Sequence, residues 1–199
     1  VLAGHVASDP LNGLVLGAGL DWREVDLVRA YLDYFLQLQG TLTRPYLRGV
    51  LLENPLAVRL LVQLHAARLD PGVDAAAREA GEAHLRRAFE GYRDRIASLN
   101  EDRALSGLYA LVLATLRTSF FAELAPPHRI AFKIDPALVP EIAPPRPWRE
   151  IFVHTNTLIG LHLRGGPVAR GGLRWSDRPE DFRTEVLGLV KAQMVKNTV

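Results

Sequence analysis

The chain has 199 residues, of which 48% are apolar and 23% are charged, and its formal net charge is +2. This balance is typical of a folded globular chain and argues against disorder. Its charges are interspersed, without a basic run of five or more, so no tail that binds nucleic acid or a membrane surface is indicated. The absence of cysteine excludes disulfides, thiolate catalysis and cysteine-based zinc sites, and it fits a reducing cytoplasm.

Targeting and membrane segments are not expected either. The sequence has no stretch of 18 uninterrupted apolar residues, and its first residues lack the basic and apolar regions of a signal peptide. It starts at Val1 without an initiator Met and stops at Val199 without a Gly cap or polar tail. We therefore expect an internal piece of a longer protein.

Helical periodicity dominates residues 1–124. Asp9-Pro10 predicts an N-cap followed by Pro at the first helical position, and Asp21 can cap a second helix that ends at Gly40. The buried face of that second helix is predicted from apolar spacings of three and four, at Val25, Val28, Tyr31, Leu32, Phe35 and Leu38. Later helices are expected from Asn54-Pro55 to Asp70-Pro71-Gly72, over 73–99, and from Asn100 through Leu116 to Phe120. Nothing in this α-helical module requires a ligand.

The period changes to two after residue 125. Ile130, Phe132 and Ile134 alternate with more polar residues and predict one strand within a Pro-rich connection over 125–149. Further strands are expected at about 150–154, 158–163 and 168–175, followed by a helix over about 179–198. The expected class is α+β: an N-terminal helical module, then the opening strands and helix of an α/β domain over 150–199.

The last predicted helix carries polar residues on its expected buried face. On a wheel of 100° per residue with Phe182 at zero, the apolar stripe runs through Leu189, and Gln193 and Lys196 fall at about 20° and 320°. Lys191 falls on the opposite, solvated side. A buried Lys needs partners, which a charged ligand would supply. The alternative is a frayed helix end from which Lys196 reaches solvent along its own apolar stem.

The strand before that helix holds Arg170-Gly171-Gly172. A Gly pair inside a strand favours close approach of backbone or ligand, and arginine binds planar carboxylates in a bidentate way. Together with Gln193 and Lys196, this segment offers a dicarboxylate one cation for each carboxylate. The alternative is an edge-strand bulge with solvated arginines.

Other site types fit these residues less well. Residues 164–166 and 170–172 both read Arg-Gly-Gly, as in RNA-binding segments, but those segments are disordered and repetitive whereas these lie in alternating apolar strands. Neither a GxGxxG loop nor a Walker A sequence is present. His154 and His162 lie in adjacent predicted strands and could be cross-strand neighbours, but two histidines without an acid pair do not favour a metal site.

Two segments resemble the signature of the large bacterial NAD-dependent glutamate dehydrogenases. They are residues 161–178, LHLRGGPVARGGLRWSDR, and residues 180–197, EDFRTEVLGLVKAQMVKN. Less specifically, residues 18–25 resemble the helical region that precedes the catalytic core in that family. The resemblance implies oxidation of L-glutamate to 2-oxoglutarate and ammonia, with the hydride passing to NAD.

The resemblance also implies roles for the candidate residues. Arg170-Gly171-Gly172 matches a Lys-Gly-Gly motif whose cation faces the substrate's side-chain carboxylate. Gln193 and Lys196 match helix positions that hold the substrate, with Lys196 near the α-carboxylate. Arg170 replaces the Lys of the small glutamate dehydrogenases, with a different reach and geometry.

The rest of the active site is expected beyond Val199. That includes the catalytic residues and the NAD-binding domain, so the chain alone is expected to be inactive and to hold no metal. The parent enzyme is expected to be a cytoplasmic homo-oligomer that binds neither nucleic acid nor membrane. Two alternatives stay open: the helical module is a regulatory or oligomerisation element without a ligand site, or the parent is another amino-acid dehydrogenase of the same fold.

Overall fold

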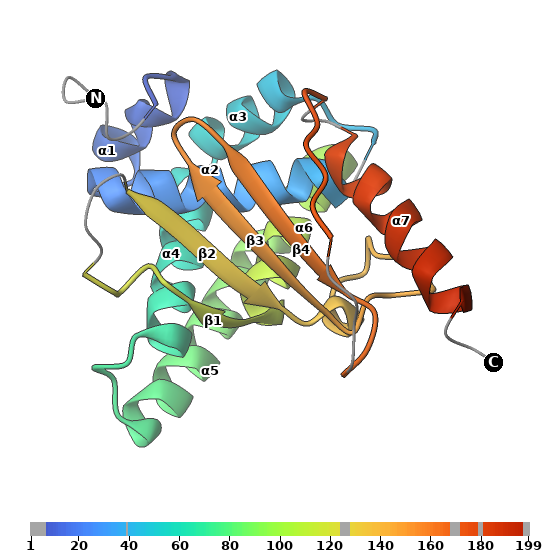
Figure 1. The fold of residues 1–199 in the computed structure, drawn as a ribbon. Coiled ribbons are helices and arrows are strands. Elements are labelled where there is room, and N and C mark those ends of the chain that lie inside the picture. The colour runs from blue at the N-terminus through green and yellow to red at the C-terminus, as the bar shows by residue number, and fades with distance from the viewer. Residues whose placement is uncertain (1–6, 39, 124–127, 168–171, 179–180, 197–199) are drawn as a thin grey trace.

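The computed structural model describes residues 7–38, 40–123, 128–167, 172–178 and 181–196, with side chains described as far as Ala192. Within these ranges, a helical part packs behind a four-stranded antiparallel sheet, and one further helix lies beside the sheet (Figure 1). The protein is therefore of the α+β class, as predicted. No described helix is both long and apolar enough to cross a membrane.

The helical part begins at the predicted caps. Asp9 accepts a hydrogen bond from the Leu11 N–H at 3.1 Å. Asp21 and Glu24 form a capping box, in which each side chain accepts from the other residue's backbone N–H at 2.8 Å. The helices of this part are η1 (Pro10–Gly13), α1 (Leu14–Gly17), α2 (Trp22–Leu38), α3 (Arg44–Glu53), α4 (Pro55–Leu69), α5 (Ala75–Arg93) and α6 (Leu99–Ala114).

Three of these helices differ from the prediction. Helix α3 is not predicted at all, although Thr43 caps it by accepting from the Tyr46 N–H at 3.4 Å. The helix predicted over 73–99 ends at Arg93, and Ser98 caps a separate helix that begins at Leu99. Helix α6 does not continue to Phe120. Its chain turns into a strand at Thr115, where pairing with a neighbouring strand overrides the helical spacing of the apolar residues.

The sheet has the order β1-β2-β3-β4, and its inner face packs on the helices behind it (Figure 1). On that face, Ile130, Phe132 and Ile134 are fully buried, which confirms the predicted alternation. The strands predicted at 150–154 and 158–163 are also confirmed. The strands are β1 (Thr115–Thr118), β2 (Arg129–Ile134), β3 (Arg149–Thr155) and β4 (Ile159–Arg164).

Aromatic packing joins the sheet to α2. The rings of Tyr31 and Phe132 stack with centroids 4.2 Å apart, and those of Tyr34 and Phe152 lie 5.0 Å apart. All four side chains are buried. Burial of large aromatic rings supplies much of the apolar free energy that holds a helix to a sheet. This packing holds β2 and β3 against α2.

The strand predicted at 168–175 is not confirmed where the structure describes it. From Gly172 to Trp175 the chain has no regular secondary structure and joins no strand. Leu173 is fully exposed and Trp175 is 85% exposed, so their alternation has no sheet face to cover. Helix α7 (Phe182–Lys196) then follows, beside β4 and the C-terminal end of α2 (Figure 1).

Candidate functional site

The residues predicted to bind a dicarboxylate lie at the margins of the described structure. Arg170 and Gly171 fall outside the described residues, whereas Gly172 is described and exposed. Gln193 and Lys196 lie in the last turns of α7, and their side chains fall outside the described part. The contacts of these residues with a ligand stay a prediction. The structure shows how helix α7 and the segment that follows Gly172 are held in place.

Glu185 of α7 joins the segment that follows Gly172 to this helix. Its Oε2 accepts from both Nε and Nη2 of Arg174 at 3.3 Å, and its Oε1 accepts from the Ser176 hydroxyl at 3.4 Å. Arg178 adds an ion pair of 2.5 Å between its Nη2 and Oε1. These contacts hold the segment that follows Gly172 against α7. Glu185 was not predicted as a site residue, although an acid in the first turn of a helix that follows a segment with two arginines is a signal for such contacts.

The buried face of α7 differs from the predicted one. Arg183 is only 6% exposed, while Leu189, predicted to lie on the buried stripe, is 54% exposed. Lys191 is exposed, as predicted. The reason is that Arg183 pairs with a buried carboxylate, so the side of the helix that carries Arg183 faces the core in place of the predicted apolar stripe. Because Leu189 of the predicted stripe is exposed, the helical spacing does not support burial of Lys196.

That carboxylate is Glu150 of β3, which is completely buried. Arg183 donates from Nε to Oε2 at 3.0 Å and from Nη2 to Oε1 at 2.5 Å, a bidentate ion pair. Tyr34 of α2 donates its hydroxyl to Oε2 at 2.6 Å, and Gln37 Oε1 accepts from the Arg183 backbone N–H at 3.1 Å. Helix α7 is thus joined to both α2 and β3.

The protonation states in this cluster follow from burial and charge. Burial alone would lower the pKa of Arg183, but its hydrogen bond with Glu150 and the charge of that carboxylate outweigh burial and raise it. Burial, followed by the charge of Glu150, raises the pKa of Tyr34 well above its usual value. The guanidinium therefore stays charged and the phenol stays protonated as a donor.

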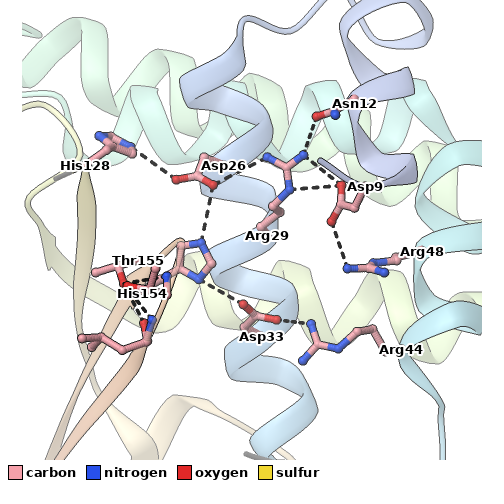
Figure 2. Close-up of polar contacts among 12 residues, drawn as sticks. Asp9, Asn12, Asp26, Arg29, Asp33, Arg44, Arg48, His128, His154 and Thr155 are labelled. Atoms are coloured by element: carbon pink, nitrogen blue, oxygen red, sulfur yellow. Dashed lines mark hydrogen bonds and ion pairs between the residues drawn. The ribbon is translucent and has the colours of Figure 1, made fainter. Parts of the chain in front are cut away.

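A second buried cluster lies where α2 faces β3 (Figure 2). His154 of β3 stands between Asp26 and Asp33 of α2, with Nε2 3.5 Å from Asp26 Oδ1 and Nδ1 3.0 Å from Asp33 Oδ2. The second distance is that of an ion pair, but its angles do not satisfy those of a hydrogen bond. Burial alone would lower the pKa of His154, yet the two carboxylates outweigh burial and raise it to about 9.

Three arginines lie along one side of this cluster (Figure 2). Arg29 Nη2 lies 2.9 Å from Asp9 Oδ1, and Arg48 Nη2 lies 2.9 Å from Asp9 Oδ2. Arg44 pairs with Asp33. Each carboxylate therefore has at least one cationic partner, and the contacts fasten the N-terminal segment, α2, α3 and β3 to one another.

A cleft of about 530 Å³ lies beside this cluster. Its wall includes Arg29, Asp33 and His154 from the cluster, and Leu173 and Trp175 from the segment after Gly172. Among the described residues, the arginines and His154 on the wall are each paired with a carboxylate.

A metal centre is not found in the described part of the chain, where no group of three or more His, Asp or Glu is placed to hold an ion. The suggested pairing of His154 with His162 across the strands is wrong. In the register of β3 and β4, His154 lies opposite Ile159, and His162 lies opposite Ile151. His154 is buried toward α2, whereas His162 is exposed.

Known proteins match the chain along most of its length. Residues 88–199 match the family model of the bacterial NAD-glutamate dehydrogenase catalytic domain, and residues 6–71 match glutamate dehydrogenase helical motif 3. NAD-specific glutamate dehydrogenases of Halomonas elongata and Mycobacterium tuberculosis are each 45% identical to it, over 100% and 98% of the chain. That of Pseudomonas aeruginosa is 44% identical over 100% of the chain.

The chain spans 12% of the length of the first two relatives and 13% of the third. The catalytic-domain model alone covers more than half of the chain, including Glu150, helix α7 and the Arg-Gly-Gly segment at 170–172. The chain therefore belongs to the bacterial NAD-glutamate dehydrogenase family.

Proposed function

We propose that the parent protein is an NAD-dependent glutamate dehydrogenase, which converts L-glutamate, NAD and water to 2-oxoglutarate, ammonia and NADH. This chain contributes part of the glutamate site. The observation that carries the proposal is the catalytic-domain match, which runs from residue 88 to residue 199 and so includes both the Arg-Gly-Gly segment and α7.

In this proposal, each carboxylate of glutamate has its own cation. Arg170 faces the side-chain carboxylate, Gly171 and Gly172 permit its close approach, and Lys196 faces the α-carboxylate while Gln193 fixes orientation. Their role is charge stabilisation and positioning. The contacts of Glu185 with Arg174 and Arg178 support this arrangement, because they hold the segment after Gly172 against the helix that carries the other two residues.

The described residues do not fit NAD. Their sheet is wholly antiparallel, whereas the dinucleotide site is built at a Gly-rich turn within parallel βαβ units. We propose that NAD and the catalytic residues belong to a part of the enzyme outside this chain, and that the parent enzyme is a cytoplasmic homo-oligomer.

Steady-state kinetics of the full-length enzyme test the proposal. Lys196→Ala and Arg170→Ala should each lower kcat/KM for glutamate by about 100-fold or more, because each removes a charge partner of the substrate. Arg170→Lys should recover part of that loss. Lys191→Ala is the matched control, since Lys191 is exposed on the same helix, and it should stay within about twofold of wild type.

Near-normal turnover of Lys196→Ala would refute the site assignment. A panel of amino-acid substrates separates the proposed activity from another amino-acid dehydrogenase. The proposal predicts that glutamate has the highest kcat/KM of the panel.

A further inference from the structure

We propose that Arg183 is a positioning residue for the glutamate site: its buried ion pair with Glu150 sets the rotation and height of helix α7, and thereby the places of Gln193 and Lys196. This inference rests on the proposed function, because those two residues are assigned to the substrate there. Arg183 itself is not assigned to the substrate, and its effect is exerted through the helix.

The geometry of the pair fixes orientation as well as distance. Two nitrogens of one guanidinium contact two oxygens of one carboxylate, at 3.0 and 2.5 Å, so rotation of either group breaks a contact. Tyr34 holds the same carboxylate from the side of α2 at 2.6 Å. The Arg183 backbone N–H belongs to the first turn of α7, where donors lack a helical partner, and Gln37 satisfies it at 3.1 Å.

Apolar packing does not fix this helix equally well. Val186, Leu187 and Val190 are only partly buried, and Leu189 is 54% exposed. An apolar seam of this kind permits small rotations and shifts, whereas a bidentate ion pair with additional hydrogen bonds selects a single register. A buried ion pair is also costly to desolvate, and apolar residues of similar size would serve stability as well or better. We therefore attribute the pair to placement of the helix rather than to stability.

The length of α7 makes the placement important. Gln193 and Lys196 lie ten and thirteen residues after Arg183, which corresponds to about 15 and 20 Å along the helix axis. A tilt of about 5° at Arg183 would move a point about 20 Å away by nearly 2 Å. A displacement of about 1 Å in a positioned group can lower a rate by about 100-fold. A small tilt of α7 at Arg183 would therefore displace Lys196 far enough to slow the reaction.

The contacts of Glu185 in α7 also help to position the proposed glutamate site. Glu185, two residues after Arg183, holds Arg174 and Arg178 of the segment that follows Gly172. Once Arg183 fixes α7 against α2 and β3, the segment from Arg174 to Arg178 is held through the same helix. In this proposal, Arg183 therefore positions both α7 and the described residues that follow Gly172.

The experiment uses two variants of the full-length enzyme. Arg183→Lys keeps the positive charge but loses the bidentate contact of the guanidinium with the Glu150 carboxylate. Arg183→Met combined with Glu150→Gln removes the charge pair, leaves no buried charge unpaired and keeps an acceptor for the Tyr34 hydroxyl. Both should lower kcat/KM for glutamate between about 10-fold and 100-fold, with the smaller loss for Arg183→Lys, while KM for NAD stays within about twofold.

Two controls separate placement from stability and from the proposed function. Phe89→Leu disturbs the stacked rings of Phe89 in α5 and Tyr109 in α6, so it should lower the melting temperature but leave kcat unchanged. Lys196→Ala reports on the glutamate site itself. The inference on Arg183 is overturned if its folded variants keep wild-type kcat/KM while Lys196→Ala is severely impaired, or if their loss merely matches that of Phe89→Leu. If Lys196→Ala is itself active, the proposed site fails and the inference fails with it.

Discussion

His154 should make the protein lose stability in mildly alkaline solution. Its imidazole is 6% exposed between Asp26 and Asp33, and its pKa is raised from 6.5 to about 9. Because the folded pKa lies above the unfolded value, the stabilisation is complete below pH 6.5 and is lost as the pH rises through 9. The difference between the folded and unfolded pKa corresponds to about 3 kcal/mol of stability.

Urea unfolding of wild type and His154→Gln at pH 6 and pH 9.5 measures this contribution. The free-energy difference between the two proteins should shrink by about 3 kcal/mol at the higher pH. The control is His162→Gln, an exposed histidine of β4, for which a change below about 0.5 kcal/mol is expected. An NMR titration that placed the pKa of His154 at or below 6.5, or a difference independent of pH, would refute the reasoning.

Two further predictions concern packing and acid stability. Gly107→Ala should lower the free energy of unfolding by about 1–3 kcal/mol, because the added Cβ would collide with the Phe35 ring. Gly91→Ala should raise the free energy of unfolding by about 0.5–1 kcal/mol, because a Cβ at this helical position would meet open space. Urea unfolding measures both variants, and equal changes in the free energy of unfolding for Gly107→Ala and Gly91→Ala would contradict the packing around Gly107. His65 is buried, and burial followed by the charge of Arg68 lowers its pKa from 6.5 to about 3, so its contribution is present above pH 6.5 and is lost as the pH falls toward 3. His65→Phe should therefore lose less stability than wild type between pH 7 and pH 4, and an equal loss would exclude this role.

Local signals predict much of the fold. The caps at Asp9 and Asp21 and the alternation through Ile130 and Phe132 depend on neighbours in sequence, so the pattern alone identifies them. Helix α6 is different, because Leu116 continues a helical spacing but sheet pairing turns the chain into a strand at Thr115.

The buried ion pair between Arg183 of α7 and Glu150 of β3 could not be predicted from the sequence of α7 alone. Arg183 and Glu150 are 33 residues apart, and only the packing of α7 on α2 and β3 brings them together. A signal was nevertheless present in β3, where Glu150 and His154 occupy the same alternating register as buried Phe152. Charged residues in the inward register of a strand indicate buried partners elsewhere in the chain.

The most direct test of the proposed glutamate site is a structure of the full-length enzyme with L-glutamate bound. We expect the α-carboxylate within hydrogen-bonding distance of Lys196 and the side-chain carboxylate in contact with Arg170. Glutamate bound elsewhere in the enzyme, with both of these side chains out of contact, would contradict the account.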